Sequence, residues 1–234
     1  MTHRKHVLAM GGGFLSDPDN NLRLERYFKE LTGLDAPKVL FIPTASGDHE
    51  PYQLRFFQAF SKLGCKPAVL PFFKRTPVDL AAFVGEHDAI AVGGGNTRTM
   101  LAIWRDWGLD AVLRAAYERG VPMGGSSAGS ICWFDQGITD SIAGSLTALP
   151  CLAIVPGSNC PHYDSEADRR PSYQAMVASG AVPDGYAADD GVALHFVDGV
   201  FHQAVANRPK SRAWAVRRGP AGAIETAVEP VRLP

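Results

Sequence analysis

Apolar runs and amphipathic segments alternate along the first half of the chain. Short runs rich in apolar residues, which we interpret as strands, cover residues 7–10, 38–42, 68–70 and 89–92. Between them, apolar positions recur at helical spacing over residues 20–31, 52–63, 97–104 and 109–119. Continuous apolar strands alternating with helices are typical of a parallel sheet covered on both faces. The pattern therefore predicts one α/β domain over residues 1–234, with helices on both sides of a mostly parallel sheet.

The pattern changes after about residue 150. Strand-like segments follow at residues 152–155, 191–196 and 200–206. Asp198-Gly199 lies between two valines, and Asp-Gly is a typical two-residue turn of a β-hairpin. Residues 214–216 and 228–233 are predicted to be final edge strands. We interpret this half as a strand-rich extension of the same domain.

Three of the predicted strands lead into glycine-rich turns. These turns lie at residues 11–13, 93–95 and 124–129. In open parallel sheets, ligands bind in the crevice beyond the carboxyl ends of the strands. We therefore expect the three turns to converge on one edge of the sheet and to form a site there.

The third turn, GGSSAGS at residues 124–130, contains the pattern Gly-x-Ser-x-Gly. A strand that bends abruptly into a helix holds its serine in a strained conformation, and only glycine fits two residues before and after it. This register selects Ser127, because Ser126 would need a glycine where Ala128 stands. The N–H of Ala128, at the start of the helix, can donate to an oxyanion. A phosphate-binding loop is disfavoured because no Gly-Lys-Ser/Thr follows.

A serine nucleophile needs a base, usually a histidine that a carboxylate holds in place. His162 lies in an irregular loop, residues 159–164, at the end of an apolar segment, and we predict that it is the base. Asp140 is our first choice for the carboxylate, with Asp135 and Glu166 as alternatives. Spacing along the chain gives no distances, so the choice among the three stays open.

Charge and composition exclude several classes of partner. The formal net charge is -1 and no run of Lys and Arg is present, so we expect no nucleic-acid partner. No apolar stretch approaches the ~20 residues of a membrane span, and the N-terminal apolar run is too short for a signal peptide. The 4 cysteines form no Cys-x-x-Cys pair, so we expect buried thiols, no metal and a cytoplasmic protein.

Taken together, the 93–97 turn, the 125–129 motif and Pro161-His162 resemble the peptidase E / cyanophycinase family of serine peptidases. The resemblance extends, in order and spacing, over most of the chain. It implies a fold like that of the class I glutamine amidotransferases, which is flavodoxin-like. It also implies a triad of Ser127, His162 and an acid, with Asp140 the first choice, and oxyanion donors at Gly95 and Ala128. No cofactor would be needed.

The resemblance further implies a dipeptidase that acts on peptides with an N-terminal aspartate. An acidic side chain needs a cationic pocket, and the candidate substrate-binding residues are Asn96, Arg98, Arg169, Arg170 and His195. Two alternatives stay open. One is a cyanophycinase-like or isoaspartyl peptide hydrolase, and the other is a non-catalytic protein that binds small molecules. The expected partner is a small peptide, and the sequence leaves open whether the chain forms a homodimer.

Overall fold

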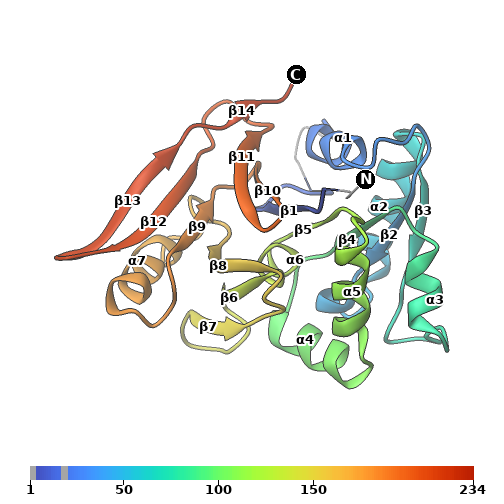
Figure 1. Ribbon diagram of the computed structural model, residues 1–234, viewed down its shortest axis with the longest axis horizontal. Helices are drawn as coiled ribbons and strands as arrows, with labels where there is room; N and C mark the ends of the chain where they lie inside the picture. The colour runs from blue at the N-terminus through green and yellow to red at the C-terminus, as the bar shows by residue number, and fades with distance from the viewer. Residues whose placement is uncertain (1–3, 17–20) are drawn as a thin grey trace.

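The computed structural model describes residues 4–16 and 21–234, and within them eight strands form the main sheet (Figure 1). In spatial order they are β14 (Val231–Arg232), β11 (Val200–Ala206), β10 (Val192–Val197), β1 (His6–Met10), β5 (Met123–Ser126), β4 (Ala89–Val92), β2 (Lys38–Ile42) and β3 (Lys66–Val69). From β1 to β3 all neighbours are parallel, whereas β10 runs antiparallel to β1 and to β11. This arrangement confirms the predicted α/β fold with a mostly parallel sheet.

Alternation of side chains along each strand supplies two apolar faces. In β1, Val7 and Ala9 join one cluster of buried residues, and Leu8 and Met10 join another. The first cluster includes buried side chains of α3 (Leu80–Gly85), α4 (Thr97–Asp106) and α5 (Leu109–Glu118). The second includes those of α1 (Arg23–Glu30) and α2 (Glu50–Lys62). Both faces are therefore covered by helices as predicted, although residue 20, where the first helix was expected to begin, lies outside the described residues.

Most strands of the second half form a second sheet, while β10, β11 and β14 join the main sheet. Among the described residues this second sheet has six strands: β13 (Gly222–Val228), β12 (Ala213–Gly219), β9 (Gly185–Ala188), β8 (Val155–Cys160), β6 (Phe134–Thr139) and β7 (Thr147–Pro150). Helix α7 (Arg169–Ser179) packs against this sheet through Tyr173 and Val177. Strand β12 lies between β9 and β13, so the prediction that residues 214–216 form an edge strand is wrong.

The hairpin predicted at residues 197–200 is confirmed. Val197 of β10 pairs with Val200 of β11, and the two turn residues, Asp198 and Gly199, have φ of 54° and 78°. Positive φ at both central positions is the geometry for which Asp-Gly is favoured.

The three glycine-rich turns meet at one edge, as expected, because β1, β5 and β4 are parallel neighbours. The second sheet reaches the same place. Between β9 and β10 the chain passes from one sheet to the other, and there Asp190 forms a bridge with Gly12 at the end of β1. The carboxyl ends of strands from both sheets therefore surround a single site.

No helix in residues 4–16 and 21–234 is long and apolar enough to span a membrane.

Candidate active site

Ser127 lies at the bend between β5 and α6 (Ala128–Ile131). Its backbone has φ 58° and ψ −115°, a strained combination for a residue with a side chain. Ser127 is half-buried, whereas Ser126, the last residue of β5, is only 6% exposed. The bend therefore presents Ser127 and not its neighbour. The helix that follows is a single turn, and the chain then enters β6 instead of continuing as the longer helix that we expected.

Strand β4 explains why glycine is needed on both sides of Ser127. A methyl group at Gly125 would lie 2.3 Å from the carbonyl oxygen of Val92, and one at Gly129 would lie 2.1 Å from the same oxygen. A methyl group at Gly125 would also lie 2.7 Å from the carbonyl oxygen of Gly129. The steric argument from the motif thus holds, but the main obstacle is the backbone at the end of the neighbouring strand.

The backbones of Ser127 and His162 are hydrogen-bonded to two consecutive residues, Met10 at the end of β1 and Gly11 directly after it. The N–H of Ser127 donates to the carbonyl of Met10 at 3.3 Å, and the N–H of His162 donates to the carbonyl of Gly11, also at 3.3 Å. The Nδ1–H of His162 donates to Oδ1 of Asp190 at 2.8 Å. The end of β1 therefore holds the backbone of the serine and the backbone of the histidine at consecutive positions.

The carboxylate at His162 is Asp190, which the sequence analysis did not select. Asp140 follows β6 in the second sheet, its side chain is 67% exposed, and it lies 3.8 Å from Nη2 of Arg169. Asp135 accepts the N–H of Gly157 at 2.8 Å. Glu166 accepts from Nε of Arg169 at 2.7 Å. The prediction that Asp140, Asp135 or Glu166 holds the histidine is therefore wrong in this geometry.

Neighbouring parallel strands explain why Asp190 reaches His162. Strands β8 and β9 pair with Cys160 opposite Ala187, and the histidine and the aspartate follow shortly after these two residues. Ligand sites lie beyond the carboxyl ends of parallel strands, and this rule located the glycine turns. Asp189 and Asp190 also follow an apolar segment, so the same rule could have identified this acid. It was missed because β9 was not recognised as a strand.

Several groups fix the backbone of Asp190. Its N–H donates to Oδ1 of Asp164 at 2.8 Å, and its carbonyl accepts from the hydroxyl of Ser211 at 2.6 Å. Gly12 lies directly against the side chain, since a methyl group there would be 2.0 Å from Oδ1 of Asp190 and 3.1 Å from Cε1 of His162. The carboxylate thus has little freedom to turn away from the histidine.

The environment of Asp190 favours its ionised form. Burial raises its pKa, but the hydrogen bond and charge of His162, a hydrogen bond from Ser165 and the charge of Arg208 lower it, and these contributions prevail. The pKa of Asp190 therefore lies below its ordinary value. An ionised carboxylate at Nδ1 orients the imidazole and stabilises its protonated form.

The turn after β4 lies against the serine. A methyl group at Gly94 would be 3.1 Å from Cβ of Ser127, and Gly95 has φ 135° with no room for a side chain next to the carbonyl of Ala45. The Gly94 N–H donates to the hydroxyl of Tyr52 at 3.4 Å. Within the described part of the chain, the N–H groups of Gly95 and Ala128 have no hydrogen-bond partner.

The structure does not bring Arg169, Arg170 and His195 to the site as expected. Arg169 is buried and donates to Glu166 and to the carbonyl of Ile138. Arg170 lies 4.3 Å over the ring of Trp214 and pairs with Glu225. These contacts bind the second sheet and α7 together, and the role of the two arginines in substrate recognition stays a prediction.

His195 lies in the main sheet, opposite Leu8 and away from the carboxyl edge. Its Nε2 is 2.9 Å from Nδ1 of His6, and its Nδ1 is 2.9 Å from the hydroxyl of Tyr27. Burial, and then the charges of His6 and His202, lower the pKa of His195 to about 4. It is a buried residue of the core whose two ring nitrogens are bonded within the protein, and its role in substrate binding stays a prediction.

Asn96 and Arg98 lie at the start of α4, next to the Gly94–Gly95 turn. Oδ1 of Asn96 accepts the N–H of Thr99 at 2.8 Å, so this side chain caps the helix. The side chain of Arg98 is exposed, and its backbone N–H donates to Ser141 at 3.2 Å. Both residues border the site, with Asn96 already occupied as a cap.

We next consider a metal site and a cysteine nucleophile among the described residues. They contain no group of three or more His, Cys, Asp or Glu side chains placed to hold a metal ion. All four cysteines are free. Burial raises the pKa of Cys160 to about 12 and that of Cys132 well above its ordinary value. The thiols are therefore protonated and poor nucleophiles.

Sequence comparison identifies relatives over most of the chain. The model of peptidase family S51 matches residues 7–204. The uncharacterized peptidase YgaJ of Bacillus subtilis (strain 168) is 48% identical over 212 residues, which cover 91% of this chain and 92% of that protein. A probable alpha-aspartyl dipeptidase of Drosophila melanogaster is 32% identical over 152 residues, covering 63% of this chain and 60% of that protein.

Structural comparison finds the same fold in a putative peptidase E protein from Listeria monocytogenes EGD-e. The TM-score is 0.64 at 20% identity, and the match covers 85% of this chain and 97% of the other. Together with the sequence matches, this similarity confirms the resemblance drawn from the three motifs.

Proposed function

This chain belongs to peptidase family S51 and is a peptidase, and we propose that it uses Ser127, His162 and Asp190 as a catalytic triad to hydrolyse small peptides with an N-terminal aspartate. One observation carries the proposal. The end of β1 binds the backbone of both Ser127 and His162, while His162 donates to Asp190 at 2.8 Å. A nucleophile, a base and an orienting carboxylate are thereby held on rigid strand ends.

In the first half of the reaction, Oγ of Ser127 attacks the carbonyl carbon of the peptide bond. Because Nδ1–H of His162 is bonded to Asp190, Nε2 is left to accept the hydroxyl proton. The tetrahedral intermediate then collapses, the C–N bond breaks, and His162 returns the proton to the leaving amine. An ester of Ser127 with the N-terminal residue remains.

In the second half, water attacks the ester carbonyl and gives a proton to His162. The C–O bond to Ser127 breaks, His162 returns the proton to the serine, and the amino acid leaves. In both halves, the N–H groups of Gly95 and Ala128 are the proposed donors to the oxyanion. Their lack of another partner in the described residues supports this role.

Similarity to a named relative and access to the histidine–carboxylate pair support the substrate class. The Drosophila relative is named a probable alpha-aspartyl dipeptidase, and it is 32% identical to this chain. His162 and Asp190 keep side-chain exposures of 20% and 24%, so a small substrate can reach the pair. We accordingly propose α-linked aspartyl dipeptides, for example Asp-Leu, as substrates.

A comparison of Ser127→Ala with the wild type tests the proposal. The wild type should cleave Asp-Leu faster than Ala-Leu or Leu-Leu, and a fluorophosphonate should label it once, on Ser127. Ser127→Ala should lose labelling and at least about 10³-fold in kcat, with its melting temperature little changed. Turnover by this variant at the native rate would exclude Ser127 as the nucleophile. Faster cleavage of Leu-Leu or of β-linked Asp-Leu would exclude the proposed specificity.

A further inference from the structure

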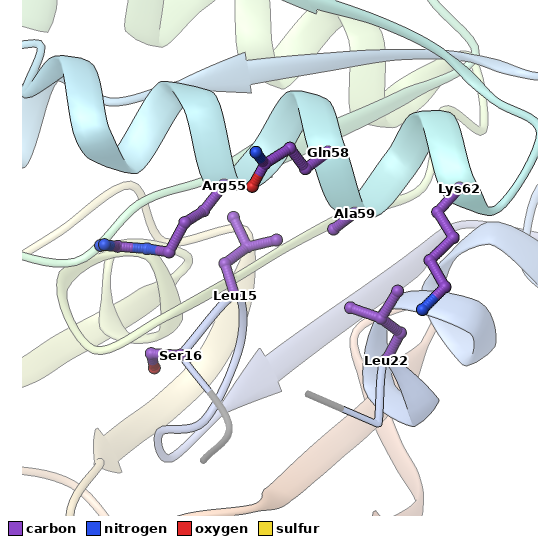
Figure 2. Close-up of a pocket in the computed structure, with 7 residues that line it drawn as sticks. All are labelled: Leu15, Ser16, Leu22, Arg55, Gln58, Ala59 and Lys62. Carbon is purple, nitrogen blue, oxygen red and sulfur yellow. The ribbon is translucent and has the colours of Figure 1, made fainter. Parts of the chain in front are cut away.

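A cavity of about 550 Å³ lies along α2, and its described lining contains none of Ser127, His162 and Asp190. Figure 2 shows its lining residues: Arg55, Gln58, Ala59 and Lys62 of α2 on one side, with Leu15, Ser16 and Leu22 facing them. Contacts with the proposed triad come instead from the loop that follows β8, and this loop binds the acid of the triad directly.

Residues 162–165 bind Asp190 through both its side chain and its backbone. Strand β8 ends at Cys160, and two residues later His162 has φ 54°, a left-handed conformation that turns the chain away from the strand direction. From this loop, Nδ1–H of His162 donates to Oδ1 of Asp190 at 2.8 Å. Oδ1 of Asp164 accepts the N–H of Asp190, also at 2.8 Å. Two residues of one loop, two positions apart, therefore hold the acid at two points.

The carboxylate of Asp164 takes the place of a backbone acceptor between the two chains. The parallel pairing of β8 with β9 ends just before the loop, and the N–H of Tyr163 then donates to the carbonyl of Ala188 at 3.1 Å. Further along, the N–H of Asp190 meets the side chain of Asp164 instead of a backbone carbonyl. Because a backbone N–H left without a partner is costly, this side chain continues the pairing where the backbone of the loop has turned away.

Both peptide groups of Asp190 are anchored, and Asp164 anchors the first of them. On the following side, the carbonyl of Asp190 accepts from the hydroxyl of Ser211 at 2.6 Å, and the chain forms its bridge with Gly12. The two peptide groups of a residue set the direction of its Cα–Cβ bond. The bond to Asp164 therefore helps to aim the carboxylate of Asp190 at His162, and small errors in such an alignment lower catalytic rates strongly.

Building on the proposed triad, we propose that Asp164 is a positioning residue for the reaction. Its carboxylate holds the backbone of Asp190, so that Asp190 keeps its bond to Nδ1 of His162 while the imidazole gains and loses a proton at Nε2. Asp164 acts through Asp190, with no step of the reaction at its own atoms. The role needs an oxygen that accepts the N–H of Asp190 and does not need the negative charge. An asparagine can therefore fill it, whereas an alanine cannot.

Steady-state kinetics of the full-length chain with Asp-Leu test this role. Asp164→Ala should lower kcat about tenfold or more, because the acid is less well aligned with the imidazole. KM should stay within about twofold, since this alignment matters in the transition state and not for substrate binding. Asp164→Asn should recover most of kcat. Asp35→Ala is the matched control: this exposed aspartate precedes β2, at the opposite edge of the sheet, and its loss should leave kcat unchanged.

A double-mutant cycle shows whether Asp164 acts through Asp190. In Asp190→Asn, the further change Asp164→Ala should lower kcat by less than about twofold, because the carboxylate that Asp164 positions is already absent. A full tenfold loss in that background would overturn the inference, as would native kcat in Asp164→Ala or no recovery in Asp164→Asn. These results would leave the proposed triad intact. Native kcat in Asp190→Asn would instead refute the triad and the role of Asp164 with it.

Discussion

At the scale of single residues, Ser127 combines strain with a fixed backbone. Its φ of 58° and ψ of −115° cost about 1–3 kcal/mol for a residue with a side chain. The bond from its N–H to Met10, and the bonds of Ser130 and Ile131 to its carbonyl, hold this conformation. The strain is consistent with a position selected for chemistry, because a plain turn could use glycine there at lower cost.

The identity of the acid gives a prediction at this scale. Asp190→Asn should lower kcat for Asp-Leu by up to about 10⁴-fold, because an amide stabilises neither the correct tautomer nor the imidazolium. Asp140→Asn is the matched control and should keep kcat within about twofold, since its exposed side chain faces Arg169 instead of His162. Steady-state measurement of kcat for both variants would show which aspartate acts with His162. A large loss in Asp140→Asn with none in Asp190→Asn would reverse the assignment.

At the scale of elements, the site is a junction between strand ends. Strands β1, β5 and β4 of the main sheet bring the glycine turns together, and β8 and β9 of the second sheet bring His162 and Asp190. Gly12 lies between the two sets, with its backbone bridged to Asp190. Gly12 therefore has a different role from the glycines around Ser127. Because it has no side chain, the two sheets can pack closely at this point.

Gly12→Ala tests this contact. The added methyl group would lie 2.0 Å from Oδ1 of Asp190, so the histidine–carboxylate pair must move. A displacement of this kind should lower kcat by about 10²-fold and stability by about 1–3 kcal/mol. Gly85→Ala, at the end of α3, is the control, because a methyl group there meets nothing within 4 Å. Kinetics and urea unfolding would be measured for both. Native kcat in Gly12→Ala would show that the pair tolerates the displacement.

At the scale of the whole molecule, the main sheet carries a buried histidine that the site does not use. His195 contacts His6 and Tyr27 in the interior, where its exposure is 4%. Burial, followed by the charges of His6 and His202, lowers its pKa from 6.5 to about 4. Between pH 6.5 and about 4, His195 is therefore protonated in the unfolded chain but stays neutral in the folded protein.

The consequence is a pH dependence of folding stability. Between pH 6.5 and about 4 the unfolded state binds more protons, so stability present above pH 6.5 is lost as the pH falls toward 4, by up to about 3 kcal/mol from His195. His195→Gln should flatten this slope, as measured by urea unfolding at pH 7, 5.5 and 4.5. His49→Gln, at an exposed position before α2, should follow the wild type. Equal slopes in wild type and His195→Gln would contradict the assignment to His195.

Local patterns were sufficient for much of the fold. The strands at residues 38–42 and 89–92 appear in the structure with the same bounds, and Gly120, with φ 87°, follows the end of α5 as predicted. The apolar periodicity within a segment records which side faces the core, so it can be interpreted without knowledge of other segments. In contrast, β9 and α7 were not predicted, since their sequences have weaker periodicity and depend on packing in the second sheet.

The sequence by itself determined the mostly parallel α/β sheet, the convergence of the glycine turns and the choice of Ser127 over Ser126. These conclusions follow from steric and periodic constraints that act over a few residues. Only the tertiary structure decided that Asp190 partners His162 and that Arg169, Arg170 and His195 are bonded to other parts of the protein. Each of these depends on distances between segments far apart in the chain, which are set when β8 pairs with β9 and the two sheets meet at β1.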